Sequence, residues 1–100
     1  MLIIAGTLTF DPTKTEQAKE AAAEVMAATQ AEPGCITYAF SLDMADPATI
    51  RVFEAWESQE ALDAHFQTPH VAAFSAKVAD LGISGMDLLK HQVASSGPVR

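Results

Sequence analysis

Cysteine, basic residues and long apolar runs are all scarce in this 100-residue chain. Its single cysteine, Cys35, cannot form an internal disulfide and is expected to be a small buried residue of a strand. Six lysine and arginine residues stand against thirteen aspartate and glutamate residues, so the net charge is −7 and the chain repels phosphate backbones and anionic lipids. The longest apolar stretch, residues 1–10, is too short to cross a bilayer and lacks the flanks of a signal peptide. We therefore expect a cytoplasmic protein that binds neither nucleic acid nor membranes.

The sequence also lacks the short motifs that mark many enzyme classes. It contains no glycine-rich phosphate loop, no serine elbow, no Cys-x-x-Cys pair and no His-Glu-x-x-His element. Its hydrophobic content of 49% is nevertheless enough for one core of ordinary size. We expect a single domain over residues 1–94 and a frayed tail over residues 95–100.

The distribution of apolar residues predicts four strands and two helical regions. Residues 1–10 are apolar or small at nearly every position, which is typical of a strand covered on both faces. Residues 14–31 place apolar side chains three and four apart and predict a helix, which Thr13 and Glu16 could cap and Pro33-Gly34 would end. Residues 35–57 predict a hairpin, and residues 58–81 predict a helical region that is broken at Thr68-Pro69. Residues 86–94 predict a last strand.

The resulting order, β-α-β-β-α-β, is that of the α+β ferredoxin-like fold, in which a four-stranded antiparallel sheet carries both helices on one face. The second face of the sheet would then be apolar as well. Phe53 and Ala55 alternate with Val52 and Trp56 along the third strand, so both of its faces carry apolar side chains. A monomer would expose this surface, and we expect a homodimer that buries it.

Histidines are the side chains with an ordinary pKa near neutrality, and they are the first candidates for catalysis. His65 shares the inward stripe of Ala61 and Leu62 and is predicted to lie at the edge of the core, either as a structural residue or as a base in a pocket. His70 lies in the first helical turn after Thr68-Pro69, where the helix dipole favours the neutral imidazole. The two histidines are five residues apart, which is not the spacing that places two metal ligands on one helical face, so no metal site is expected. His91 has no partner nearby in the sequence and is predicted to lie at the surface or in an interface.

Several aromatic residues could converge between the helices and the sheet. They are either plain core residues or the walls of a flat pocket with a tyrosine hydroxyl and two imidazoles as its polar groups. Glu54 alternates with Trp56 on one side of the third strand and is expected to be exposed or paired, with catalysis as the lesser alternative. The aromatic residues of this set are Tyr38, Trp56, Phe66 and Phe74.

Two segments of the chain resemble the antibiotic biosynthesis monooxygenase family, and its quinol monooxygenase-like members in particular. The resemblance rests on EPGCITY over residues 32–38 and on FEAWESQEALDAHFQTPH over residues 53–70, and it extends over about residues 2–94. It implies a dimeric α+β barrel with a substrate pocket in each subunit. It also implies a monooxygenase that oxidises quinols or polycyclic phenols with molecular oxygen and uses no flavin, metal or haem.

On this resemblance, Tyr38 and Trp56 would line the pocket, and His65 or His70 would remove a phenolic proton. Two alternatives from other classes stay open. Another branch of the family isomerises a small phosphorylated compound and also carries the T-P-H element of residues 68–70, although this chain has few cations to meet a phosphate. The third possibility is a dimeric ligand-binding module without turnover, which a pocket filled by its own aromatic side chains would favour.

Overall fold

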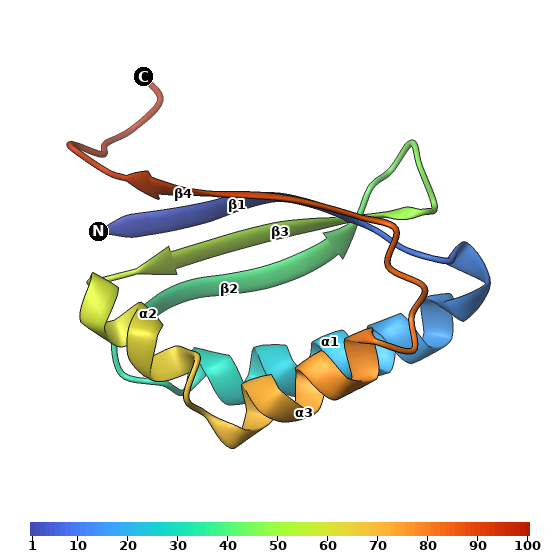
Figure 1. The fold of residues 1–100 in the computed structure, drawn as a ribbon. Coiled ribbons are helices and arrows are strands. Elements are labelled where there is room, and N and C mark those ends of the chain that lie inside the picture. The colour runs from blue at the N-terminus through green and yellow to red at the C-terminus, as the bar shows by residue number, and fades with distance from the viewer.

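The computed structural model describes residues 1–100 as one antiparallel sheet with helices on one of its faces (Figure 1). The predicted ferredoxin-like fold is confirmed, and the second helical region consists of two helices that meet at Thr68-Pro69. In chain order the elements are β1 (Leu2–Thr9), the short 3-10 helix η1 (Pro12–Lys14), α1 (Thr15–Gln30), β2 (Cys35–Leu42), β3 (Thr49–Trp56), α2 (Gln59–His65), α3 (Pro69–Val78) and β4 (Gly85–Gln92).

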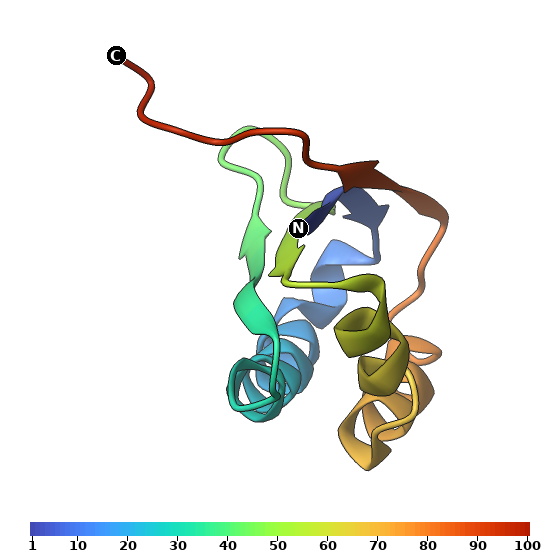
Figure 2. The ribbon, with the colours of Figure 1, turned by 90° about the vertical axis from the view of Figure 1, so that its left-hand side faces the viewer.

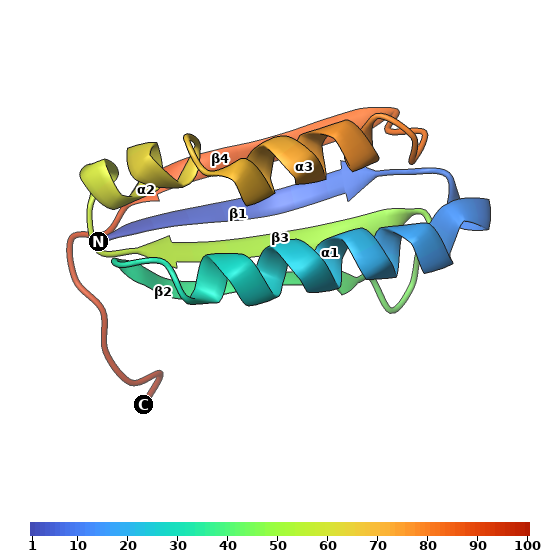
Figure 3. The ribbon, with the colours of Figure 1, turned by 90° about the horizontal axis from the view of Figure 1, so that it is seen from below.

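The four strands lie in the order β2-β3-β1-β4, and every neighbouring pair is antiparallel. Gly6 of β1 lies opposite Val52 of β3 and Leu88 of β4, which fixes the register of the central strands. Seen from the helical side, α1 lies over β2 and β3, whereas α2 and α3 lie over β1 and β4 (Figure 3). The helices therefore form a single layer, in which α1 also contacts α3.

Side-chain caps start the helices, although not all of them are those that the sequence predicts. The Ser58 hydroxyl accepts a hydrogen bond from the Ala61 amide at 3.1 Å and begins α2. The capping box expected between Thr13 and Glu16 does not form, because the Asp11 carboxylate accepts from the Thr13 amide and caps η1 instead. Helix α1 then begins at Thr15 as a continuation of η1, with no side-chain cap of its own.

The core between the sheet and the helices divides into two clusters. One cluster packs around Leu8, Phe10 and Val52, near the ends of the strands where η1 lies. The other contains the aromatic side chains of Tyr38 and Trp56 and lies at the opposite end, below which α2 is found. Phe40 of β2 packs against both clusters and joins them.

Strand β2 contains an irregularity that changes which of its side chains face the helices. The register with β3 shifts between Cys35 and Thr37. The sequence predicts Ile36 on the same side as Tyr38, but this prediction is wrong, because the shift leaves Ile36 half exposed while Tyr38 is buried. Cys35 is partly rather than fully buried at the start of the strand.

The helices leave one face of the sheet uncovered (Figure 1), and the centre of this face carries apolar side chains. Phe53 and Leu89 lie on either side of Ala5 in one row across this face, and they are 43% and 61% exposed. The homodimer that would bury this face remains a prediction. Residues after β4 run away from the sheet (Figure 2), and the division into a domain over residues 1–94 and a tail over residues 95–100 stays a prediction. None of the helices combines the length and the apolar character needed to span a bilayer.

Candidate active site

Three segments bring Glu32, His65 and His70 to one end of the molecule. Glu32 lies in the turn between α1 and β2, where Pro33 and Gly34 end the helix. His65 is the last residue of α2, and His70 is the second residue of α3. Thr68 holds the two helices together, because its hydroxyl donates to the His65 carbonyl at 2.7 Å and accepts from the Val71 amide. The break at Thr68-Pro69 thus turns both imidazoles toward Glu32.

A single carboxylate oxygen joins the two histidines. The Oε2 atom of Glu32 lies 2.7 Å from Nδ1 of His65 and 2.8 Å from Nε2 of His70. A carboxylate oxygen only accepts, so each of these ring nitrogens carries the hydrogen of its bond. In the neutral rings the lone pairs are then on Nε2 of His65 and Nδ1 of His70. Glu32 therefore fixes the tautomer and the orientation of two potential bases at once.

Burial acts against the negative charge of Glu32, but the two histidines outweigh it. The carboxylate is shielded from water, which by itself would favour the protonated form. The hydrogen bonds and positive charge that His65 and His70 can supply lower the pKa of Glu32 below its ordinary value. The side chain is therefore an anion at neutral pH and stabilises an imidazolium beside it.

His65 is packed between aromatic rings at the end of the core. Its side chain is buried, and its ring centroid lies 4.8 Å from that of Trp56 and 5.2 Å from that of Tyr38. Trp56 has no exposed surface. The ring of His70 lies 6.1 Å from that of His65 and is 24% exposed, so it is the histidine that solvent reaches.

Glu54 is a second carboxyl of this region, and it is buried rather than exposed. Its Oε1 atom accepts a hydrogen bond from Nε1 of Trp56 at 3.0 Å. Burial raises the pKa of Glu54, and the neighbouring charge of Glu32 adds to this effect, whereas Trp56 and His65 oppose it. Burial in the same cluster raises the pKa of Tyr38 well above its usual range, so the Tyr38 hydroxyl stays protonated and can donate a hydrogen bond.

The four aromatic residues predicted to line a substrate pocket have different environments. Tyr38 and Trp56 are buried beside His65. Phe74 of α3 is half-buried, with its ring 5.4 Å from that of Phe40. Phe66 is 57% exposed and lies beside His65 at the surface, with 5.5 Å between the ring centroids. The structure therefore gathers all four around the histidines and Phe40, from the core outward.

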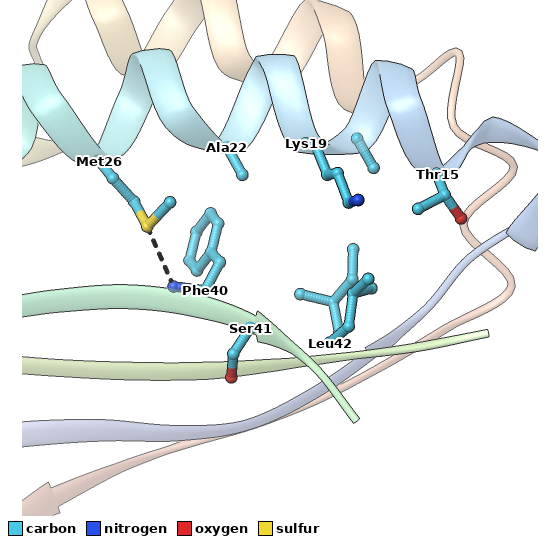
Figure 4. A pocket seen from close by; sticks show the side chains of 9 residues that line it. Thr15, Lys19, Ala22, Met26, Phe40, Ser41 and Leu42 are labelled. Atoms are coloured by element: carbon cyan, nitrogen blue, oxygen red, sulfur yellow. Dashed lines mark hydrogen bonds between the residues drawn. The ribbon is translucent and has the colours of Figure 1, made fainter. Parts of the chain in front are cut away.

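An apolar cavity of about 270 Å³ lies between α1 and the strands β2 and β3 (Figure 4). Neither histidine lines it, and Phe40 separates it from Tyr38, whose ring centroid is 5.2 Å from that of Phe40. The backbone amide of Phe40 donates to the sulfur of Met26 at 3.3 Å and so links β2 to α1 beside the cavity (Figure 4). The residues around the cavity are Thr15, Ala18, Lys19, Ala22, Met26, Phe40, Ser41, Leu42 and Ile50.

Sequence reasoning predicted both histidines but missed Glu32 and the cavity. Glu32 opens the EPGCITY segment, yet its place directly before Pro33-Gly34 suggested only a turn. An acidic side chain at the end of a helix was the other feature of Glu32 visible in the sequence. Such a feature does not show that its partners are His65 and His70, which are 33 and 38 residues away. His91, which is predicted to lie at the surface or in an interface, is exposed on β4.

Comparisons with known proteins agree with this architecture. The sequence model of the family described as antibiotic biosynthesis monooxygenase matches residues 1–77. An uncharacterised protein of Synechocystis sp. is 30% identical over 95 residues, which are 95% of this chain and 65% of that protein. The chain thus spans just under two thirds of this relative's length.

Two solved structures have closely similar folds. A protein of Deinococcus radiodurans, named as a candidate antibiotic biosynthesis monooxygenase, superposes with a TM-score of 0.91 at 21% identity, with 100% of this chain and 99% of that chain covered. A conserved protein of unknown function from Bacteroides thetaiotaomicron superposes with a TM-score of 0.81 at 29% identity, with 90% and 94% covered.

Proposed function

Because the chain belongs to the antibiotic biosynthesis monooxygenase family, we propose that it is an enzyme that oxidises a quinol or polycyclic phenol with molecular oxygen. The observation that carries this proposal is the pair of hydrogen bonds from His65 and His70 to one oxygen of Glu32. An imidazole oriented by a carboxylate is a general base whose protonated form is stabilised by the adjacent negative charge.

The reaction begins when one of the free imidazole nitrogens takes a proton from the substrate. The electron-rich anion reduces oxygen and forms a carbon–oxygen bond, which gives a hydroperoxide; loss of water from it leaves a quinone. The substrate supplies the electrons, and one oxygen atom enters the product while the other leaves as water. The protein contributes the base, its orientation and a site with little water.

His70 is the base that a substrate can reach directly, because its ring is partly exposed while that of His65 is buried. Glu32 acts as a positioning residue that holds the lone pair of His70 on Nδ1. His65 and the aromatic rings of Tyr38 and Trp56 then form the wall behind the reacting atoms. Phe66 and Phe74 would contact the outer parts of a planar substrate.

The active unit would be a homodimer. The open face of the sheet carries Phe53 and Leu89 in one row, and burial of both side chains against a second copy would remove them from water. This face lies on the side of the sheet away from α2 and α3, the helices that contain His65 and His70 (Figure 1). Dimerisation would therefore stabilise the sheet that supports the site and leave the helical face free for substrate.

Oxygen uptake and quinone formation test the proposal. Metal-stripped protein would be incubated with a panel of quinols and anthrone-like phenols, alongside His65→Ala, His70→Ala and Glu32→Gln, with Glu60→Gln on the exposed surface of α2 as the matched control. We expect uptake without added cofactor, a fall of about 100-fold or more in His70→Ala, and no change in Glu60→Gln. No uptake above the spontaneous rate on any substrate would refute the oxidative function. Binding without turnover would then favour a ligand-binding module, in agreement with the dense packing around His65.

One observation favours a second function, isomerisation of a phosphorylated compound. Lys19 lines the apolar cavity and is the cation that could meet a phosphate at its rim. Lys19 also lies 3.6 Å from Glu16, so its charge is partly compensated. Binding of a sugar phosphate that is lost in Lys19→Ala, in a protein inactive toward phenols, would support this alternative.

A further inference from the structure

The Glu32 cluster offers a set of atoms that differs from an ordinary ion pair. Glu32 Oε2, His65 Nδ1 and His70 Nε2 all lie within 4.8 Å of one another and come from three separate segments. Two imidazole nitrogens and one carboxylate oxygen are a set of ligands that zinc and other divalent transition metals prefer. We propose that these three atoms bind a divalent transition-metal ion, with water in the remaining coordination position.

The distances define the rearrangement that an ion would require. Metal–ligand bonds of about 2.0–2.2 Å in a tetrahedral site place the ligand atoms roughly 3.3 Å apart. The two bonds of Glu32 are 2.7 and 2.8 Å, so its oxygen would move outward by about half an ångström, and the two imidazole nitrogens, which lie within 4.8 Å of each other, would close to about 3.3 Å. Glu32 can make this movement because it lies in a turn and not inside a helix.

The surroundings suit such a site. The side chains of His65 and Glu32 are 3% and 11% exposed, so two of the three ligands are shielded from water, and the rings of Trp56 and Tyr38 hold His65 in place. The side chain of His70 is 24% exposed, which provides a route for the ion and room for water. The net charge of −7 also favours the approach of cations.

Metal binding would reverse both tautomers. In the hydrogen-bonded arrangement the protons are on Nδ1 of His65 and Nε2 of His70, the two atoms that would have to bind the ion. When both rings are neutral, the proton of each ring moves to its other nitrogen and none is released overall. The lone pairs on Nε2 of His65 and Nδ1 of His70 are then lost. A metal ion at this position therefore inhibits the proton abstraction of the proposed function, on which this consequence rests.

Calorimetric titration of metal-stripped protein with Zn²⁺, in the absence of substrate, tests the site itself. We expect one ion per chain, and affinity more than about tenfold lower in both Glu32→Gln and His70→Ala. His91→Ala and Glu57→Gln, two changes at exposed residues, should bind as the wild type does. The far-UV circular dichroism of each variant shows whether it is folded. His70→Ala is the safer of the two ligand changes, because the side chain of His70 is more exposed than that of Glu32. Equal Zn²⁺ affinity in the wild type and both ligand variants would overturn the proposal.

Absorption by Co²⁺ gives a second readout that does not depend on stability. A tetrahedral site with two nitrogen ligands gives visible bands, which should appear in the wild type and be absent from folded His70→Ala. The two proposals can fail separately. If the protein binds Zn²⁺ but the metal-free protein takes up no oxygen, the metal site stands and the monooxygenase function is refuted. If the protein takes up oxygen, does not bind Zn²⁺ and is not inhibited by it, the monooxygenase function stands and the metal site is refuted.

Discussion

Thr29 allows a quantitative test of how the core beside the site is built. This residue of α1 has no exposed surface, and its Oγ1 atom makes no hydrogen bond of ordinary geometry, although the Tyr38 hydroxyl lies near enough to interact with it. A buried hydroxyl without a partner costs about 1–3 kcal/mol of desolvation free energy. Valine has nearly the same shape and a similar helix propensity, and it carries a methyl group in place of the hydroxyl. We expect Thr29→Val to raise the free energy of unfolding by about 1 kcal/mol or more.

Urea denaturation measured through the fluorescence of Trp56, the one tryptophan of the chain, gives this free energy. Protein concentration must be the same for all variants, because a dimer becomes more stable as concentration rises. Thr29→Ser is the matched control: it keeps the hydroxyl, loses a buried methyl group, and should lose about 1 kcal/mol. A valine variant that is less stable than the wild type would refute the reasoning, because the hydroxyl would then have a partner in solution.

Two further predictions concern the strands. The folded-state pKa of Glu54 lies above its ordinary value of 4.5, so the unfolded chain ionises first and wild-type stability falls as the pH rises between the two pKa values. As the pH is raised from acidic to mildly alkaline, the free energy of unfolding of Glu54→Gln should therefore increase relative to that of the wild type, by about 1.4 kcal/mol for each unit by which the folded and unfolded pKa values of Glu54 differ. A difference between the two proteins that does not change with pH in urea titrations would contradict this. Gly6→Ala should cost at least about 3 kcal/mol, because the added Cβ would lie 1.8 Å from the Asp87 carbonyl oxygen. Gly85→Ala is the control: its Cβ would meet only the Thr9 side chain at 3.3 Å, so it should cost far less stability in the same thermal or urea unfolding experiment. A loss of stability in Gly6→Ala no larger than that in Gly85→Ala would contradict the prediction, because β1 and β4 could then move apart to accept the methyl group.

The elements of the fold could be predicted because each depends on residues close together in the chain. The three- and four-residue spacing of Ala18, Ala21 and Val25 predicts α1, and these side chains are indeed buried against the sheet. Thr68-Pro69 predicts the start of α3 for the same local reason, since proline suits the first turn and the threonine hydroxyl caps it. The shift in β2 that exposes Ile36 could not be predicted, because it depends on how β2 pairs with β3.

Some features of the candidate site could be predicted from the sequence, and others depend on tertiary packing. The sequence indicated His65 and His70 through their helical positions and through the resemblance to a known family, but it treated them as alternatives. It gave no reason to expect that Glu54 would be buried and bonded to Trp56, because alternation along a strand does not show how closely the helices cover that face. The roles of these residues in catalysis remain predictions.

By itself the sequence determined the order of helices and strands, the four-stranded ferredoxin-like sheet and the acidic character of the molecule, because periodicity, turn residues and charge are local properties. Only the tertiary structure decided that Glu32 joins both histidines, since its partners are 33 and 38 residues away along the chain. The turn after α1 and the break between α2 and α3 meet only when both helices pack on the same face of the sheet. Long-range packing thus creates the carboxylate–imidazole contacts, which no local pattern encodes.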